Sequence, residues 1–251
     1  MPELKSTRWS VLRQRSRSFL LWAVVVPIGI LFGSGLGVRT LLVEAFKIPA
    51  ASMSPTLLVG DHIFVTKYDY MGGQLPARGD VVVFQYPYSE DGKPPDYVKR
   101  VVGLPGDELA FERGLLSIDG KPVPTCLVGR ARLQNGTSNA EFDIYLERLG
   151  EHSYLVALES GMSHRADGPY VVPEGEVWMA GDNRANSLDS RFWRRSGSST
   201  PGAGVPASFI KGRASRVWMP AARFWTEVNA EPTLPPELSM LSAALAACQG
   251  K

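Results

Sequence analysis

The sequence predicts a mostly β protein that follows one membrane-spanning helix and carries a smaller, inserted β subdomain. Three observations lead to this fold class. Glycine and proline, 25 and 19 of the 251 residues, recur along the whole chain, which suits short strands and turns better than long helices. Runs of β-branched and aromatic residues alternate with turn sequences beyond residue 60. One run, Phe19–Val38, contains no charge and is about as long as a helix that spans a bilayer.

The N-terminal segment determines the expected orientation in the membrane. Residues 1–18 form a basic tail in which Lys5, Arg8, Arg13, Arg15 and Arg17 outnumber Glu3. An excess of basic residues before a span predicts that this tail is cytoplasmic and that the rest of the chain lies outside. A cleaved signal peptide is the alternative, but the apolar run is long for one and no Ala-x-Ala cleavage site precedes Arg39. We therefore expect an uncleaved anchor at 19–38.

Three glycines in the expected anchor recur at four-residue spacing, namely Gly29, Gly33 and Gly37. Residues at this spacing share one face of a helix, and small residues on one face allow two membrane helices to approach closely. The alternative is that glycine is simply common in membrane spans. The sequence leaves open both a helix-pairing surface and this simpler interpretation.

The bulk composition excludes several kinds of partner and cofactor. A net charge of +2 gives no reason to expect nucleic-acid binding. The three histidines, His62, His152 and His164, lack metal-ligand spacing, and we expect neither a metal nor another cofactor. Two cysteines, Cys126 and Cys248, are too few for a disulfide scaffold, and they either form one bridge in an oxidising compartment or stay unpaired.

The expected strands follow from local composition and alternation. Strands are predicted at 63–67, 81–86, 96–102, 171–179 and 209–219, each next to a turn sequence such as Gly60-Asp61 or Arg78-Gly79-Asp80. Between them, 108–172 contains short β-like pieces at 108–111, 115–118, 141–146 and 153–158, and reads as an inserted all-β subdomain. Residues 39–46 are expected to be a short bridge after the anchor. The Leu- and Ala-rich stretch 238–247 predicts a short helix.

The stretch Ile48–Leu57 presents one serine hydroxyl, Ser52, among small residues. Pro49 and Pro55 fix their own φ and push the residues before them towards extended geometry. A stiff, extended backbone close to the membrane anchor is a suitable place for a nucleophile. We therefore interpret Ser52 as a candidate nucleophile that needs an activating base.

Lys99 is the first candidate for that base. Strand alternation over 96–102 places Lys99 and Arg100 on opposite faces, so one of the two cations is expected to face inwards. A lysine acts as a base only when it is neutral, and desolvation is what lowers its pKa. Lys67 and Lys47 are the second and third candidates. Ser208–Lys211 fits a Ser-x-x-Lys pattern, but the further motifs of enzymes that use it are missing.

Four blocks of the sequence closely resemble the type I signal peptidases (leader peptidases) of bacteria. They are Ser52–Leu57, Arg78–Phe84, Tyr97–Asp107 and Gly181–Arg191, in the order that this family shows and after an N-terminal anchor. The resemblance covers about 19–107 and 171–220. It implies a catalytic antiparallel β core, and it implies removal of signal peptides after small residues at positions P1 and P3 of the substrate.

The resemblance also implies a role for single residues. Ser52 would be the nucleophile, Lys99 the general base, and Ser187 the hydroxyl that orients the lysine amine. The loop positions Asp182, Asn183, Arg184, Asp189 and Arg191 would hold the site through ion pairs and hydrogen bonds. The substrate pockets would be formed by Phe46, Ile48, Pro49, Ala50, Met53, Leu57, Ile63, Tyr97 and Val98.

Position 50 departs from the family pattern. Many members carry a serine there, whose hydroxyl helps to bind the oxyanion, and this chain has Ala50. The backbone N–H of Ser52 would remain as one oxyanion donor. Ser54 is a further hydroxyl nearby, without other support as a substitute.

The expected organisation is a cytoplasmic tail (1–18), an anchor (19–38), a catalytic core in two parts (39–107 and 173–225), the insert (108–172) and a C-terminal tail (226–251). The expected protein is a single-pass enzyme of the bacterial inner membrane, with its catalytic domain on the periplasmic side. Its expected partners are signal-peptide-bearing precursors and the lipid bilayer, which Trp218 and Met219 would contact. The alternatives are a narrow-substrate relative that processes pilin or conjugation proteins, and a non-catalytic anchored β domain.

Overall fold

The computed structural model describes residues 42–70, 72–86, 95–135, 138–160 and 167–250. Of the two compact units of the chain, Met1–Val43 and Glu44–Lys251, these ranges lie almost wholly in the second. The expected tail and anchor, with Gly29, Gly33 and Gly37, lie outside the described residues. Within the described ranges, no helix combines the length and the apolar character that a membrane crossing requires.

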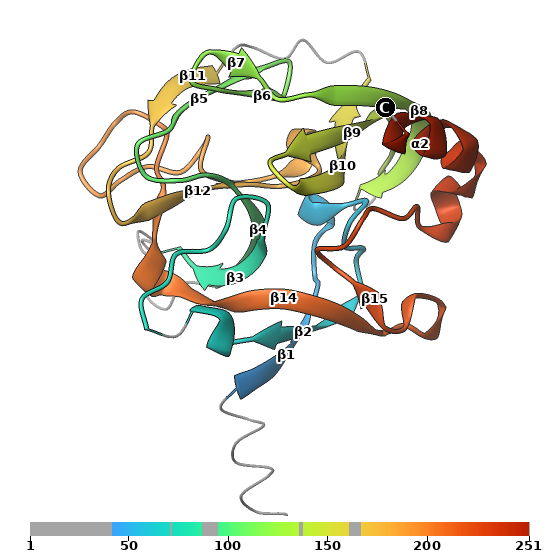
Figure 1. Cartoon of the computed structure of the whole chain (residues 1–251), viewed down its shortest axis with the longest axis horizontal. Coiled ribbons are helices and arrows are strands. Elements are labelled where there is room, and N and C mark those ends of the chain that lie inside the picture. The colour runs from blue at the N-terminus through green and yellow to red at the C-terminus, as the bar shows by residue number, and fades with distance from the viewer. Residues whose placement is uncertain (1–41, 71, 87–94, 136–137, 161–166, 251) are drawn as a thin grey trace, which may run out of the picture. The chain divides into compact units, whose positions relative to one another are not determined.

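The largest element is an eight-stranded sheet in the order β1-β2-β14-β3-β4-β12-β13, with β15 also paired to β14 (Figure 1). Its strands are β1 (Val43–Lys47), β2 (His62–Thr66), β3 (Val81–Gln85), β4 (Asp96–Gly103), β12 (Glu176–Ala180), β13 (Val205–Pro206), β14 (Ile210–Met219) and β15 (Thr226–Glu227). The pairs around β3, β4, β12 and β14 are antiparallel. The fold class is therefore mostly β and antiparallel, as the sequence predicts.

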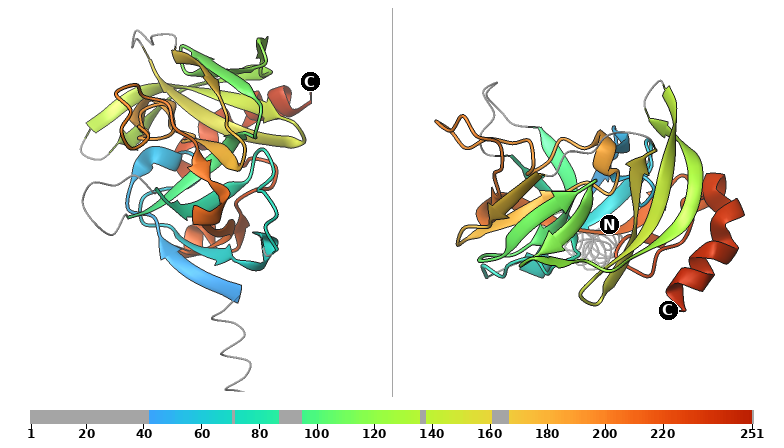
Figure 2. Two further views of the ribbon diagram at one scale, coloured as in Figure 1. Left: turned by 90° about the vertical axis from the view of Figure 1, so that its left-hand side faces the viewer. Right: turned by 90° about the horizontal axis from the view of Figure 1, so that it is seen from above.

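The described residues between 108 and 171 form two smaller sheets. One has the order β11-β5-β6-β7 and contains β5 (Glu108–Glu112), β6 (Leu115–Ile118), β7 (Lys121–Pro122) and β11 (Asp167–Val171). The other has the order β10-β9-β8 and contains β8 (Thr125–Asn135), β9 (Ser138–Leu149) and β10 (His152–Glu159). The long, curved β8 and β9 stand out in Figure 2. The sequence prediction made β9 too short and missed β8, in which an irregularity in the strand pairing at Leu127–Gly129 breaks the alternation between the buried Val128 and Ala131.

The eight-stranded sheet is covered on both faces, which explains its buried strands. Along β3, Val81 and Val83 pack into one apolar cluster with Ile63, whereas Val82 and Phe84 pack into another with Trp193. The next strand, β4, is likewise buried on both faces near its C-terminal end. This has a direct consequence for the two adjacent cations of that strand.

Lys99 and Arg100 are both buried, with 4% and 2% of their surface exposed. The sequence prediction that only one of them faces inwards is therefore wrong for this strand. The reason is tertiary: the face that carries Arg100 packs against Tyr154 of β10, whose ring centroid lies 3.9 Å from the guanidinium carbon. Alternation along a single strand does not reveal a second covering layer.

The sheets of 108–171 share an apolar cluster with the eight-stranded sheet. Val102 of β4 and Trp178 of β12 pack with Leu109, Phe111 and Tyr154 in one buried group. Glu147 of β9 is fully buried and reaches the loop after β12. This region is therefore held against the eight-stranded sheet by apolar packing and by the ion pair of Glu147 with Arg184, in addition to its covalent connections along the chain.

The C-terminal residues form a 3-10 helix, η6 (Pro236–Leu241), followed by α2 (Ser242–Gln249). This confirms a short helix near the predicted range 238–247. Leu238, Leu245 and Cys248 pack against β8 and β9 in a further apolar cluster (Figure 2). Cys248 is bonded to Cys126 as a disulfide with a Cα–Cα distance of 5.8 Å, which resolves the alternative left open by the sequence.

Five further 3-10 turns connect the strands of the described residues. They are η1 (Ala51–Met53), η2 (Tyr68–Tyr70), η3 (Arg184–Asn186), η4 (Ala207–Phe209) and η5 (Ala221–Arg223). β1 replaces part of the short bridge expected at 39–46, and it forms one end of the eight-stranded sheet. Its position matters for function because the candidate nucleophile follows directly after it.

Candidate active site

The segment that carries Ser52 runs from β1 into the short turn η1. Ala50 is extended, with φ −136° and ψ 154°, and the chain then turns over Ala51–Met53. The expected extended geometry therefore holds before Ser52 and is replaced by a turn at the serine itself. The Ser54 N–H donates to the Ala51 carbonyl at 3.0 Å, and the Asn183 N–H donates to the Ser52 carbonyl at 3.1 Å. These bonds fix the backbone on both sides of the serine hydroxyl.

Lys99 lies directly beside Ser52. Its Nζ is 2.7 Å from Ser52 Oγ and donates to the Val98 carbonyl at 3.0 Å. The two residues are 47 positions apart, and β4 brings them together because Lys99 projects from the face of the sheet on which the serine segment packs. Lys67, by contrast, pairs with Glu44 at 2.6 Å. Of the three candidate lysines, only Lys99 has this contact with the serine hydroxyl among the described residues.

Burial changes the proton affinity of the Lys99 amine. Desolvation lowers the pKa of Lys99 from 10.5 to about 8. The carboxylates of Asp189 and Asp182 oppose this change, and the Arg191 guanidinium adds to it. A lysine with such a pKa is substantially neutral in mildly alkaline solution, so it can accept a proton from a hydroxyl at hydrogen-bonding distance.

A cleft of about 370 Å³ opens over the two residues. Its lining combines residues of β1 and the serine segment with the start of β4 and the loop after β12: Phe46, Lys47, Ile48, Pro49, Ala50, Ser52, Met53, Asp96, Tyr97, Val98, Lys99, Asn186 and Leu188. Most of the predicted pocket residues are among them. Asp96, Asn186 and Leu188 are additions that the sequence did not suggest, and Lys47, the third candidate base, also lines the cleft.

Leu57 and Ile63 do not line this cleft, and here the structure differs from the predicted pocket. Both are fully buried, and they pack with Ile48 and Met53 in the apolar cluster beneath it. Met53 and Ile48 separate them from the open space because those two side chains belong both to the cleft wall and to the core. Leu57 and Ile63 thus support the floor of the cleft from below.

Two strand edges border the cleft. β4 pairs with β3 from Asp96 to Arg100, whereas β12 pairs with β4 only at Arg100 and beyond. In the described ranges, one edge of Asp96–Lys99 is therefore without a strand partner, and β1 is the terminal strand of its sheet. Backbone groups on such edges can pair with an added extended peptide.

Arg100 and Asp182 form a fully buried, two-pronged ion pair beneath the site. Arg100 Nε and Nη2 donate to the two Asp182 oxygens at 2.8 and 2.7 Å, and Nη1 donates to the Gly79 carbonyl at 2.7 Å. The Thr56 hydroxyl donates to Asp182 at 2.5 Å. Removing one partner of such a buried pair typically costs about 3–5 kcal/mol, because the other charge is left uncompensated.

The other charged loop residues are also paired. Arg184 bonds to Glu147 through both outer nitrogens, at 2.6 and 3.2 Å, and Arg191 bonds to Asp189 at 2.8 Å through two nitrogens. Asp189 also accepts the Gly181 N–H at 3.0 Å. Burial would raise the pKa of the Asp189 carboxyl, but Arg191 and the Gly181 N–H hold this pKa below its ordinary value. The predicted loop thus forms a rigid, charge-paired support.

Ser187 is buried next to the catalytic segment but does not hydrogen-bond Lys99. A Cβ placed on Gly181 would lie 2.2 Å from Ser187 Oγ and 2.5 Å from the Ser52 carbonyl oxygen. The predicted bond from this hydroxyl to the lysine amine is therefore wrong for this structure, in which Lys99 bonds to Ser52 and Val98. The buried Ser187 hydroxyl interacts instead with the Asp189 carboxylate and helps to hold the pKa of that carboxyl below its ordinary value, although no hydrogen bond of strict geometry reaches this hydroxyl within the described residues.

The two residues considered for the oxyanion lie in different environments. Ala50 is exposed and lines the cleft. Ser54 is 3% exposed, and its hydroxyl donates to the Leu57 carbonyl at 3.3 Å, away from the cleft. Ser54 is thus not placed to donate to a group bound at Ser52.

The sequence missed the charged supports that come from distant elements. Glu147 and Thr56 belong to this network around the loop and have no local signal in the sequence, and the sequence marks Arg100 only as one of two adjacent cations.

Comparison with known proteins places this geometry in a family. A family profile described as "Signal peptidase, peptidase S26" matches residues 20–219. A signal peptidase I of Pseudomonas aeruginosa is 41% identical over 199 residues, which cover 73% of this chain and 67% of that protein. One from Aquifex aeolicus is 30% identical over 220 residues, covering 76% and 81%. A solved signal peptidase I of Enterococcus faecalis has a TM-score of 0.31 at 21% identity, covering 56% of this chain and 97% of that structure.

The profile match extends over most of the chain and contains Ser52, Lys99 and the loop 181–191. An identity of 41% over 73% of this chain and 67% of the Pseudomonas aeruginosa protein shows that the two proteins share a family. The chain therefore belongs to the signal peptidase family, peptidase S26, and is a serine peptidase.

Proposed function

We propose that this enzyme removes signal peptides from secreted precursors, with Ser52 as nucleophile and Lys99 as general base. One observation carries the proposal: the buried Lys99 amine lies 2.7 Å from the Ser52 hydroxyl, at the floor of an open cleft. Signal peptide removal is the activity named for the relatives, and it agrees with a cleft bordered by strand edges and by small or apolar side chains. The catalytic core is proposed to consist of residues 39–107 and 173–225. The insert between these two parts is proposed to be 108–172.

The chemistry follows from the pair. Neutral Lys99 takes the proton of the Ser52 hydroxyl while the oxygen attacks the carbonyl carbon of the scissile peptide bond. The protonated amine then gives its proton to the leaving nitrogen, and the signal peptide remains bonded to Ser52 as an ester. Water attacks this ester with Lys99 again as the base. The backbone N–H of Ser52 is proposed to donate to the oxyanion.

Substrate recognition is proposed to use the two strand edges. A precursor in extended form would pair with the edges of β1 and of Asp96–Lys99, which fixes its register. Side chains at P1 and P3 would point into the cleft between Ala50, Met53 and Tyr97, where large groups are excluded sterically.

The rate is expected to depend on the protonation of Lys99. Below pH 8 the amine is charged and cannot accept a proton, so kcat/KM should fall about tenfold per pH unit; above pH 8 it should level off. The measurement is the pH profile of kcat/KM for a purified precursor. A rising limb close to pH 10.5, the ordinary lysine value, would contradict the depressed pKa.

Ala50→Ser tests whether the oxyanion lacks a donor. A hydroxyl at this exposed cleft position is expected to raise kcat by roughly tenfold, since a single oxyanion donor is worth about 10²–10³ in kcat when ideally placed. Ala45→Ser is the matched control, because it adds the same hydroxyl in β1 to a residue outside the cleft lining. An unchanged kcat for Ala50→Ser would show that another donor already serves the oxyanion.

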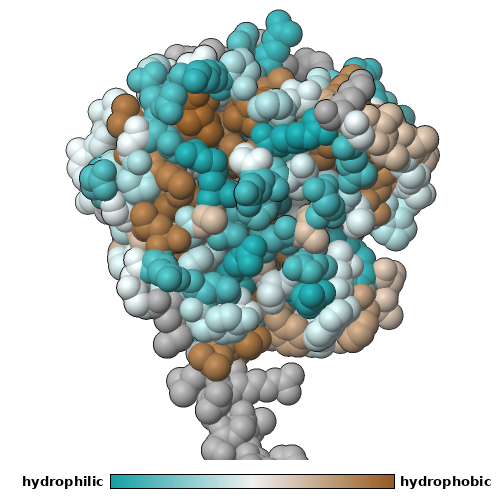
Figure 3. Space-filling view, in the orientation of Figure 1, coloured by the Kyte–Doolittle hydropathy of each residue, from teal (hydrophilic) through white to brown (hydrophobic). Residues whose placement is uncertain are grey.

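The location of the enzyme is proposed to be the bacterial inner membrane, with 19–38 as a single anchor and the catalytic unit on the periplasmic side. An aromatic surface formed by Phe64, Trp218, Met219, Phe224 and Trp225 supports lipid contact. Phe64 stacks on Trp218 and meets Trp225 edge-on, and the exposed fractions of Phe224 and Trp225 are 63% and 53%. Figure 3 shows apolar side chains at the lower end of one face, by β1, and further apolar groups at its left and in its upper part, with polar side chains between them.

Cleavage of a purified secretory precursor tests the proposal. The enzyme is expected to release a mature protein whose N-terminus follows a small-Xaa-small sequence, and N-terminal sequencing gives that position. A panel that includes pilin precursors distinguishes general from narrow specificity. Intact precursors of every kind after long incubation would contradict the proposed function.

A further inference from the structure

The C-terminal segment beyond the family profile returns to the back of the nucleophile segment. The profile match ends at residue 219, where β14 ends. The next turn, η5, carries Arg223, and β15 then pairs back onto β14. Arg223 is brought by this turn to the segment that joins Ser52 to β2.

Arg223 holds both ends of the loop 56–61. Its Nη2 donates to the Thr56 carbonyl at 2.7 Å, and its Nη1 donates to Asp61 Oδ2. Asp61 is 1% exposed, and the same carboxylate oxygen accepts the Leu58 N–H at 2.9 Å. A planar guanidinium that donates to two fixed acceptors restrains both of them, which a single surface ion pair does not do.

The restraint on Thr56 continues to the catalytic serine. The Thr56 hydroxyl donates to Asp182, and the N–H of the next residue, Asn183, donates to the Ser52 carbonyl. Thr56 therefore connects Arg223 on one side to the loop that holds Ser52 on the other. Each of these contacts is a directed hydrogen bond at 3.1 Å or less.

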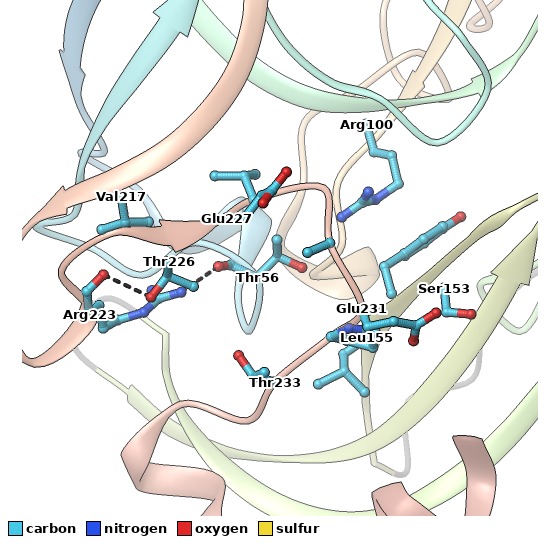
Figure 4. Close-up of a pocket in the computed structure, with 14 residues that line it drawn as sticks. Thr56, Arg100, Ser153, Leu155, Val217, Arg223, Thr226, Glu227, Glu231 and Thr233 are labelled. Atoms are coloured by element: carbon cyan, nitrogen blue, oxygen red, sulfur yellow. Dashed lines mark hydrogen bonds between the residues drawn. The ribbon is translucent and has the colours of Figure 1, made fainter. Parts of the chain in front are cut away.

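Packing alone does not fix Thr56, because a small cavity of about 30 Å³ lies against it. Figure 4 shows Arg223 and Thr56 on one side of this cavity and Arg100 on another, with Leu155 and Thr233 also at its edge. A side chain that faces unfilled space loses dispersion contacts on that side. The position of Thr56 thus depends on its polar bonds, namely those to Arg223 and to Asp182.

We infer that Arg223 is a positioning residue for peptide cleavage, which holds Thr56 so that the Asp182–Asn183 loop keeps Ser52 within reach of Lys99. The inference rests on the proposed function. It adds to the family's site a residue from the segment that the family profile does not match. Arg223 contacts neither the cleft lining nor the Ser52–Lys99 pair. It is therefore inferred to affect the rate of the chemical step and not the binding of substrate.

The test measures kcat and KM for a purified precursor in Arg223→Ala, Arg223→Lys and Thr56→Val. Arg223→Ala is expected to lower kcat about tenfold or more with KM within twofold, since a misplacement of about 1 Å can cost as much as 10²-fold. Arg223→Lys should recover part of the loss, and Thr56→Val should resemble Arg223→Ala. Arg130→Ala is the matched control, because it removes an exposed Arg–Asp pair of the β8–β9 sheet and should leave kcat unchanged.

Each rate is divided by the concentration of enzyme molecules with a reactive Ser52. This concentration is measured with an activated p-nitrophenyl ester: transfer of its acyl group to the serine oxygen releases one p-nitrophenolate in an initial burst. If Arg223 acts only on stability, the burst amplitude falls while kcat per reactive serine stays within twofold of wild type, and this result would overturn the inference. The acylation rate of Ser52 by the ester is measured as well. If the wild-type enzyme fails to cleave precursors, the proposed function is wrong. The inference about Arg223 is then still tested by the ester: a slower acylation of Ser52 in Arg223→Ala supports it, and an unchanged rate overturns it.

Discussion

Ser52→Ala is expected to lower precursor cleavage by about 10³-fold or more, as removal of a catalytic serine does in other serine peptidases. The half-buried hydroxyl contacts Lys99 at 2.7 Å, and no other serine of the described residues has this contact. Alanine removes the attacking oxygen and leaves the turn η1 intact, because the bonds that fix it use backbone groups. The measurement is the initial rate of precursor cleavage, with the melting temperature as a check of folding.

Ser54→Ala provides the matched control for this variant. It removes a hydroxyl two residues away that faces away from the cleft and, among the described residues, bonds only the Leu57 carbonyl, at 3.3 Å. Cleavage should stay within a few-fold of wild type. If Ser52→Ala retained near-full activity while Ser54→Ala lost it, the nucleophile would have been assigned to the wrong residue.

Lys99→Met is expected to reduce the rate of cleavage by a similar factor of about 10³ or more. The nucleophile and its base act as a unit, so removing one of them costs about as much activity as removing both. Methionine has a similar length and suits the buried site, so the fold should persist. It cannot accept a proton, and Ser52 then lacks a base. The pH dependence of the residual rate should also lose its limb near pH 8.

Lys47→Met and Lys67→Met are the controls for the base. Lys47 lines the same cleft and Lys67 pairs with Glu44 at the surface, so both remove a positive charge without touching Ser52. Both should leave kcat within a few-fold of wild type. A large loss in Lys47→Met together with a small one in Lys99→Met would transfer the role of base to Lys47.

The core of the site could be predicted because its residues lie in short, distinctive blocks. Each block can be recognised from its own local sequence: the proline-flanked Ser52 stretch, the strand around Lys99 and the loop 181–191. The structure brings the three blocks together. The strands 63–67, 81–86 and 96–102 were predictable for the same reason, since their composition and their bounding turns agree. A disulfide between Cys126 and Cys248 had no local signal, because it joins residues 122 positions apart.

The errors about Arg100, Leu57 and Ile63 have a common physical cause in packing between distant elements. Arg100 is buried because β10 covers its face, and Leu57 and Ile63 are buried because Ile48 and Met53 lie above them. Neither fact is encoded in the periodicity of a single strand. Arg223 has no local signal at all, since its role depends on where η5 places the guanidinium relative to Thr56.

The most direct test of the central claim is to trap the acyl-enzyme. Wild-type enzyme is mixed with a precursor, quenched in acid within milliseconds, digested, and mapped by mass spectrometry. The account predicts the signal peptide in ester linkage on the peptide that contains Ser52, and no such adduct with Lys99→Met. An adduct on a different residue, or an undiminished Ser52 adduct in Lys99→Met, would contradict it.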